Sequence, residues 1–396
     1  MSQSAHTTIV GGGIMGLMIA VELVEAGVDP RSITLVEKRG FGAGSSGKSG
    51  AILRRHYSHP ALIRMAQYGL SYYASYAERF GTDIGFVRSG VCVIAGASDR
   101  ETLAKNVALQ QSLGVDVQLL EADALRAALP GARVADGTLG ADEVDAGFVD
   151  PRRVLEVLAA RLEAAGVDLR VGRRVVDLGP ALALTPRRIG LDDGTSIETD
   201  TLIIAGGPWS RSLCADLGSD LPLRAVMPEQ SYFHAPAGST MPGRVVIDLE
   251  TGLYWKPEAG ALTRVGKLAY ADDRVIDDPD HGEDGVRTSF LQSCRTQLAQ
   301  RVPAMAGATS WGGCSALYTV TPDANALVGR VPGHDDVWIV SGFCGHGFKL
   351  APSVGRGVAA LLTGGDPAPL DPELLAPDRF DRAARVDSAY AFGILG

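Results

Sequence analysis

The sequence predicts a protein of two interleaved parts, one α/β and one α+β. Residues 7–38 contain a short apolar strand that passes through glycines into an apolar helix, and residues 337–362 repeat this pattern. Between these units, residues 85–95 and 221–311 contain short alternating segments typical of antiparallel strands. A chain of 396 residues is also too long for a single compact core, so we expect two packed domains.

The first glycine turn fits the fingerprint of an adenine-dinucleotide site. Gly11, Gly13 and Gly16 have GxGxxG spacing, with a strand at residues 8–10 and a helical pattern after them. A diphosphate near Gly13, Ile14 and Met15 would meet the free N–H groups and positive dipole end of that helix. The next strand, residues 32–36, ends at Glu37, about twenty residues beyond the last glycine, where a carboxylate can hold ribose hydroxyls.

Composition narrows the possible partners. The net charge is −9 and no run of Lys or Arg stands out, so nucleic acid and anionic membranes are not expected. We expect no signal peptide and no membrane-spanning helix, because the apolar stretch after Gly16 is interrupted by Glu22. The five cysteines are scattered without CxxC spacing, which favours reduced thiols in the cytoplasm and no metal site.

Four further stretches complete the pattern. Residues 39–50 are rich in Gly and Ser, which predicts an irregular loop beside the dinucleotide. Helices are expected over residues 61–79, 99–113, 150–166, 285–300 and 352–362. The apolar run 201–205 predicts a buried parallel strand, and the Gly206–Gly207 turn after it allows the backbone to approach a cofactor. Residues 342–349, GFCGHGFK, form a second glycine-rich corner.

The chain resembles the FAD-dependent D-amino-acid oxidase superfamily over nearly its whole length, in the sarcosine oxidase and glycine oxidase-like branch. The resemblance lies in residues 9–37, in SSGKSG at 45–50 with the arginines after it, in Asp150-Pro151 with residues 201–210, and in YTVTPD at 318–323 followed by GFCGHGFK. It implies a Rossmann-like FAD-binding domain (residues 1–79, 146–214 and 316–396) interleaved with a substrate domain on a mixed, mainly antiparallel sheet (residues 80–145 and 215–315).

The resemblance also implies where FAD lies. Its adenosine would lie at Glu37 and Lys38, its diphosphate at residues 13–15, and its ring system at residues 45–49 and 342–349. His346 fits a structural histidine as well as a flavin contact. The cofactor residues expected on this basis are Gly11, Gly13, Ile14, Met15, Gly16, Glu37, Lys38, Ser45, Ser46, Lys48, Ser49, Gly50, Val175, Gly206, Trp209, Gly342, Gly345, His346, Gly347, Phe348 and Lys349.

The implied reaction is oxidation of the C–N bond of an amino acid or secondary amine. Members of the family pass a hydride to flavin N5 and release an imine that hydrolyses, without a dedicated protein base. By motif position, a substrate carboxylate would meet Arg55, or Arg54 if the register slips by one, together with Lys349. Tyr254 and Tyr318 are expected in or near the substrate pocket.

Two departures from the family pattern leave questions open. Many sarcosine oxidases attach FAD through a cysteine, where this chain has Ala316, and Cys314 is two residues too early, so non-covalent FAD is expected. Arg264 replaces the lysine that activates oxygen, so the acceptor is either O2 or another compound. Tyr318 replaces an arginine of glycine oxidase-like members.

Alternative functions are an FAD monooxygenase, whose Gly-Asp motif we do not find at 342–349, and a flavoprotein subunit that passes electrons to a partner.

Overall fold

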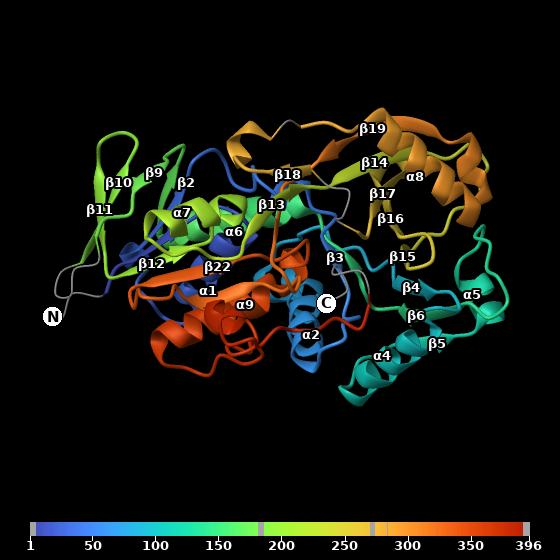
Figure 1. Ribbon diagram of the computed structural model, residues 1–396, viewed down its shortest axis with the longest axis horizontal. Helices are drawn as coiled ribbons and strands as arrows, with labels where there is room; N and C mark the ends of the chain where they lie inside the picture. The colour runs from blue at the N-terminus through green and yellow to red at the C-terminus, as the bar shows by residue number, and fades with distance from the viewer. Residues whose placement is uncertain (1–4, 181–185, 270–273, 283, 391–396) are drawn as a thin grey trace.

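Two large sheets organise the fold, one in each half of an elongated molecule (Figure 1). The computed structural model describes residues 5–180, 186–269, 274–282 and 284–390. The first sheet has six strands, of which all but the edge strand β21 run parallel. Their order is β21 (Leu327–Arg330), β22 (Val337–Ser341), β12 (Thr201–Ile204), β1 (Thr7–Val10), β2 (Ile33–Glu37) and β8 (Asp168–Val171).

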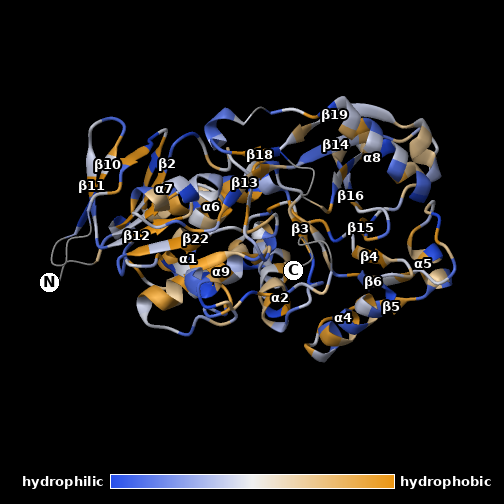
Figure 2. Cartoon of the chain, in the orientation of Figure 1, coloured by the Kyte–Doolittle hydropathy of each residue, from blue (hydrophilic) through white to orange (hydrophobic). Residues whose placement is uncertain are grey.

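Apolar helices cover this sheet because each presents a continuous buried face. Helix α1 (Ile14–Glu25) packs against α9 (Gly347–Thr363), and Figure 2 shows both largely in orange. Gly355 permits this close packing, since a Cβ there would lie 2.8 Å from Met18. The same half contains α2 (Pro60–Ala74), α3 (Tyr76–Phe80), α6 (Pro151–Ala165) and α7 (Ser210–Asp216). The Asp150 carboxylate caps α6 by accepting from the N–H groups of Arg152 and Arg153.

The second sheet has eight strands and is antiparallel except where β15 meets β4. Helix α8 (Thr288–Arg301) packs on one part of it, and α4 (Arg100–Ser112) and α5 (Ala122–Ala128) lie at the other (Figure 1). The strand order is β19 (Thr309–Ser315), β14 (Glu229–His234), β17 (Leu262–Lys267), β16 (Leu253–Glu258), β15 (Val245–Asp248), β4 (Val91–Ala95), β6 (Leu139–Glu143) and β5 (Gln118–Leu120).

Three small sheets complete the described strands. Their members are β9 (Val175–Asp177), β10 (Arg187–Leu191) and β11 (Ser196–Thr199); β13 (Arg224–Met227), β18 (Arg274–Ile276) and β20 (Tyr318–Val320); and β3 (Ile52–Leu53) with β7 (Gly147–Phe148). Figure 1 places β13, β18 and β3 where the two halves meet. The expected combination of a Rossmann-like sheet with a mixed, mainly antiparallel sheet is confirmed. The domain boundaries at residues 80, 146, 215 and 316 stay a prediction.

Local differences from the sequence-based expectations have simple causes. The expected strand before Ser89 is a single bridge from Val87 to Phe148, the last residue of the two-residue strand β7. The helix expected over 61–79 is divided at Ser75 into α2 and α3. Helix α9 begins at Gly347, five residues before the expected start at Pro352, so this proline lies inside the helix.

A tyrosine from a neighbouring helix compensates for the proline inside α9. Pro352 has no N–H, so the carbonyl of Phe348 lacks its helical donor. The hydroxyl of Tyr73 on α2 donates to that carbonyl at 3.0 Å, and Tyr73 is 1% exposed. Helices α2 and α9 are therefore joined at the first turn after the glycine corner.

Within the described residues, no helix combines the length and the apolar character that crossing a membrane requires. The expected cytoplasmic location stays a prediction.

We predict that Tyr73→Phe destabilises the fold by about 1–3 kcal/mol, because a buried carbonyl loses its donor. Urea unfolding of the purified protein measures this change. Tyr68→Phe, on the same helix, is the control, since no hydrogen bond of the Tyr68 hydroxyl is seen within the described residues. Equal unfolding midpoints for Tyr73→Phe and the parent protein would contradict the prediction.

Candidate active site

A cavity of about 350 Å³ follows the carboxyl edge of the parallel sheet. This edge is where open α/β sheets bind ligands, because the loops after neighbouring strands diverge there. Four strands contribute through the residues that follow them: β1 through 11 and 13–15, β2 through 37–39, β12 through 205–209, and β22 through 342–345, 347 and 348. Residues 42–46, Ser49 and residues 173–175 complete the wall.

The glycines of the first turn have separate roles. Gly11 has φ +119°, and a Cβ there would lie 2.4 Å from the Ala205 carbonyl of the neighbouring strand end. A Cβ on Gly16 would lie 1.9 Å from the Gly11 carbonyl, so Gly16 permits the helix to approach the strand. Gly16 does not line the cavity, whereas Gly13, Ile14 and Met15 do. The start of α1 thus presents N–H groups and its positive dipole end to the cavity.

The loop at 45–49 is held across the start of α1. The Ser46 hydroxyl accepts from the N–H of Ile14 at 3.1 Å, and the Ser45 hydroxyl donates to the Leu317 carbonyl. Lys48 points outward and binds the Asp284 carboxylate at 2.7 Å and the Ser315 carbonyl at 3.0 Å. Lys48 is therefore placed to hold the loop, and it does not line the cavity.

At the other end of the cavity, Glu37 is fixed by two backbone N–H groups. One carboxylate oxygen accepts from Gly12 and the other from Arg39, both at 2.8 Å. Each oxygen keeps acceptor capacity, so the carboxylate remains able to bind hydroxyl groups. Lys38, Val175 and Trp209 line the same cavity.

Asp280, which the sequence did not single out, fastens the rim of this end. Its carboxylate binds Lys38 at 2.5 Å, Arg39 at 2.9 Å and Arg174 at 3.1 Å, and it accepts from the Trp209 indole at 3.1 Å. Burial opposes ionisation, but the hydrogen bond from Lys38 and the nearby arginines hold the pKa of Asp280 below its ordinary value. One carboxylate from the 279–281 turn thus joins three separate segments of the cavity rim.

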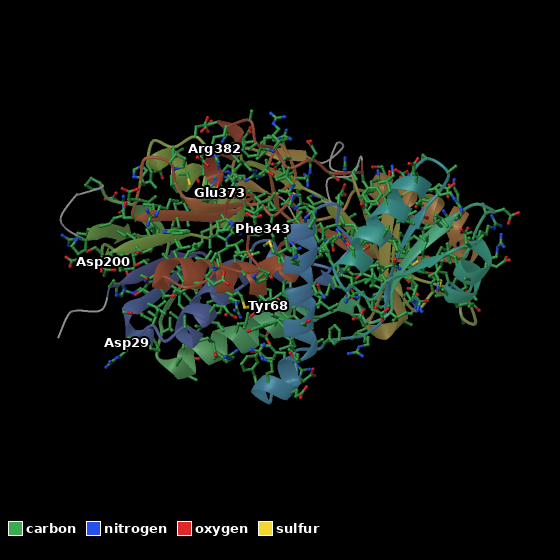
Figure 3. All side chains as sticks on the ribbon, turned by 90° about the horizontal axis from the view of Figure 1, so that it is seen from below. Asp29, Tyr68, Asp200, Phe343, Glu373 and Arg382 are labelled. Carbon is green, nitrogen blue, oxygen red and sulfur yellow. The ribbon has the colours of Figure 1, made fainter. Side chains whose placement is uncertain are left out.

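The opposite end is formed by the second glycine corner. Gly345 lies against the Tyr318 ring, and a Cβ on it would be 2.6 Å from that ring. Cys344 has φ +49°, donates to the Gly342 carbonyl at 3.2 Å, and is the only one of the five cysteines that lines the cavity. Figure 3 labels Phe343 near the middle of the long axis, between the two halves. His346 does not line the cavity and packs edge-on against Tyr57.

A second, smaller cavity of about 50 Å³ adjoins this end. The two cavities share Ser49, Tyr318, Gly345 and Phe348 in their walls. Most of the remaining wall is apolar or aromatic, and two basic side chains face it among the described residues. The wall outside the shared residues consists of Gly50, Ala51, Ile52, Arg54, Ile247, Tyr254, Leu268 and Lys349.

The two basic side chains are both deeply buried. Arg54 is 2% exposed, and its guanidinium lies 4.6 Å from the centre of the Tyr57 ring. Lys349 is 5% exposed, with its ammonium 5.9 Å from the same ring. Burial lowers the pKa of Lys349 well below its ordinary value, and the charge of Arg54 lowers it further. A bound anion would counter both effects.

Arg55 points away from both cavities. It binds Glu143 at 2.9 Å and also pairs with Asp145, so its charge is already compensated. Burial alone would lower the pKa of Arg55, but the carboxylates of Glu143 and Asp145 outweigh it, so the pKa is raised. The placement favours the register in which Arg54 is the cavity arginine; the first choice, Arg55, forms the buried ion pair behind it.

Arg264 also lies outside both cavity walls. It donates to the Lys48 carbonyl at 3.2 Å and to Gln230 at 2.9 Å, and it pairs with Glu258 at 2.5 Å. Lys256, which sequence analysis missed, shares Glu258 at 3.1 Å, and burial lowers its pKa to about 8. No local motif marks Lys256, since strand pairing alone places it opposite Arg264.

The residues present fit an adenine dinucleotide with a large ring system. A glycine turn opens the start of α1 to a diphosphate, and the Glu37 carboxylate faces the same cavity. The far end is enclosed by Phe348, Tyr318 and the backbone of 342–347, which suits a flat ring. The chain thus has the fold and site of a flavin-dependent oxidoreductase.

Comparison with known proteins identifies the family. The family model described as DAO, FAD dependent oxidoreductase, matches residues 6–361, and the chain belongs to this family. It is therefore an FAD-dependent oxidoreductase.

Two curated relatives span most of the chain. The chain is 30% identical over 377 residues to 4-methylaminobutanoate oxidase (formaldehyde-forming) of Paenarthrobacter nicotinovorans, which covers 91% of this chain and 44% of that protein. It thus spans less than half of that relative. It is 27% identical to the peroxisomal sarcosine oxidase of Homo sapiens, covering 88% of this chain and 89% of the relative.

Solved structures show the same fold. L-proline dehydrogenase from P. horikoshii matches with a TM-score of 0.85 at 23% identity, covering 98% of this chain and 100% of that chain. Glycine oxidase from Geobacillus kaustophilus matches with a TM-score of 0.81 at 22% identity, covering 95% and 98%. Non-covalent attachment of FAD stays a prediction.

We predict that Asp280→Asn speeds the release of FAD about fivefold, because a partly exposed ion-pair network worth about 1 kcal/mol is lost. The FAD-loaded protein is diluted into a scavenger that binds free FAD, and the change in flavin fluorescence with time gives the release rate. Raised salt should accelerate release from the parent protein and have less effect on the variant. Asp277→Asn, an exposed neighbour, is the control. Unchanged release and salt dependence in Asp280→Asn would exclude the role of the rim contact.

Proposed function

We propose that this protein oxidises the carbon next to nitrogen in a small amino acid or secondary amine that carries a carboxylate. The observation that carries the proposal is the pair of buried cations, Arg54 and Lys349, facing a small apolar cavity that opens on the ring end of the FAD cavity. Two buried positive charges beside apolar walls favour an anionic ligand of small size. The relatives named above, a 4-methylaminobutanoate oxidase and a sarcosine oxidase, support this substrate class.

The roles of the protein groups follow from their positions. Bound FAD supplies the oxidising chemistry by accepting a hydride equivalent from the substrate carbon. The Arg54 guanidinium offers paired N–H donors to the carboxylate and Lys349 adds a point charge. Among the described residues, no acidic side chain lines the small cavity, so the amine is accepted in its neutral form. Ile52, Ile247 and Leu268 exclude water and limit the side chain of the substrate.

Anaerobic reduction of the purified flavoprotein tests the proposal. We expect N-methyl, cyclic secondary and primary amino acids to bleach the flavin absorbance in a ranked order. A flavin that is reduced by NAD(P)H and by none of these amines would instead indicate a monooxygenase. Reoxidation by O2, compared with an artificial acceptor, then distinguishes an oxidase from a dehydrogenase or an electron-transferring subunit.

We predict that Arg54→Met raises the KM of a carboxylate-bearing substrate about 30-fold to 1,000-fold. The reason is the loss of a paired charge-assisted interaction worth about 2–4 kcal/mol. Steady-state kinetics gives KM and kcat separately. Arg88→Met, which changes an exposed arginine, is the control and should leave both constants unchanged. A KM for Arg54→Met within twofold of the parent value would refute the assignment of Arg54.

We also predict a pH dependence that originates in Lys349. The charged ammonium is needed to bind a carboxylate, and its pKa lies well below the ordinary value. Affinity is therefore full below that lowered pKa and falls as pH rises through it, earlier than an ordinary lysine would allow. Titration with an aliphatic carboxylate that has no amine, followed by flavin absorbance, isolates this effect. Lys349→Arg should move the fall to higher pH, and an identical profile in both proteins would contradict the prediction.

A further inference from the structure

We propose that the segment 384–390 belongs to the substrate site, with Tyr390 acting as a positioning residue for Arg54 through His56. This inference rests on the proposed function, because it concerns how the carboxylate-binding arginine is held. Figure 1 shows this segment in red, running from the half that contains α9 towards β3. The segment is distant in sequence from Arg54, and no motif of the chain connects them.

The first step is the contact between Arg54 and the backbone of His56. The Arg54 guanidinium donates to the His56 carbonyl and stacks on the Tyr57 ring. The position of residues 56 and 57 therefore determines where the guanidinium stands beside the cavity. A shift of this short loop would move the cation away from a bound carboxylate.

The second step is the clamp on the His56 ring, which is 0% exposed. Its Nδ1 lies 2.8 Å from Gln110 Oε1 and its Nε2 lies 2.7 Å from the Tyr390 hydroxyl. Gln110 belongs to α4, which contacts β5 and β6 of the eight-stranded sheet, so the ring is held between that helix and segment 384–390. Burial lowers the pKa of His56 to about 3, and the charge of Arg54 acts in the same direction, so the ring is neutral.

The direction of the two hydrogen bonds of His56 follows from the neutral state of its ring. Gln110 donates through Nε2 to the Glu143 carboxylate at 3.3 Å, which leaves its Oε1 to accept from His56 Nδ1–H. A neutral imidazole with its proton on Nδ1 has only an acceptor at Nε2. The Tyr390 O–H must therefore donate to it. Removal of this hydroxyl leaves a buried acceptor at Nε2 without its donor.

The third step is the anchoring of the segment itself. The N–H of Ala389 donates to Ser58 Oγ at 3.1 Å, and the N–H of Val386 donates to Asp323 at 3.2 Å. Asp323 also binds Arg379, which is 0% exposed, at 2.8 Å. Tyr390 is 5% exposed, so it reaches His56 as a buried side chain on an anchored backbone. Segment 384–390 thus joins the YTVTPD stretch to the loop that carries Arg54.

The test measures how tightly a carboxylate binds to the FAD-loaded Tyr390→Phe variant. We expect the Kd of an aliphatic carboxylate to rise about tenfold, with kcat changed less than KM for a carboxylate-bearing amine. An amine in which hydrogen replaces the carboxylate does not use Arg54, so its kcat/KM should not change. Tyr68→Phe serves as the matched control and should match the parent protein.

A double-mutant cycle separates positioning from general damage. If Tyr390 acts through Arg54, adding Tyr390→Phe to Arg54→Met should weaken carboxylate binding no further. An unchanged Kd in Tyr390→Phe, an additive cycle, or an equal loss with the uncharged amine would overturn the inference. If Tyr390→Phe does not fold, Ser58→Ala replaces it, because this change removes the acceptor of the Ala389 N–H. An unchanged Kd, an additive cycle or an equal loss with the uncharged amine would then overturn the inference in the same way.

The two proposals fail in different ways. Should Arg54→Met bind carboxylates as tightly as the parent protein, the proposed function fails and this inference falls with it. If Arg54→Met weakens binding and Tyr390→Phe does not, only the positioning role is refuted.

Discussion

Burial of positive charge beside apolar walls is the constraint on which the substrate half of this site depends. Arg54, Arg55 and Lys349 are each at most 5% exposed, and the charge of Arg55 is compensated by the adjacent carboxylates Glu143 and Asp145. Removing one partner of a buried ion pair costs about 3–5 kcal/mol, so Glu143 and Arg55 must be retained together. With that pair fixed behind the wall, Arg54 and Lys349 remain directed at the cavity.

The same pair supports the polar network that reaches Tyr390. Glu143 accepts from Arg55 and from Gln110, and Gln110 in turn fixes the proton on His56. Because Gln110 gives its amide N–H to Glu143, its oxygen accepts from His56, and this fixes the direction of the hydrogen bonds along the network. Four segments from distant parts of the sequence meet here, which makes the position of Arg54 a property of the whole fold.

The cofactor half is governed by the edge of the parallel sheet. Strands β1, β2, β12 and β22 end together, so their loops converge on one elongated cavity. Asp280 fastens the adenosine end of this cavity from a turn that follows β18, and Lys48 fastens the loop near the ring end through Asp284. Both contacts come from carboxylates that follow β18 in the chain, so residues outside the parallel sheet hold the rim of the cofactor cavity.

The elements with local signals are predictable from the amino-acid sequence. Gly11 and Gly13 of the GxGxxG turn, Glu37 at the next strand end and the glycines of the second corner (342, 345 and 347) lie on the cavity wall. These signals depend only on neighbours along the chain, and family motifs indicated Lys349 and Tyr318. The choice between Arg54 and Arg55 required the tertiary structure, because adjacent residues on an extended segment face opposite sides. Glu143 pairs with Arg55 on one side, and Arg54 faces the cavity on the other. Asp280, Lys256 and Tyr390 carried no sequence signal, since each acquires its role from charges brought together by distant strands and loops.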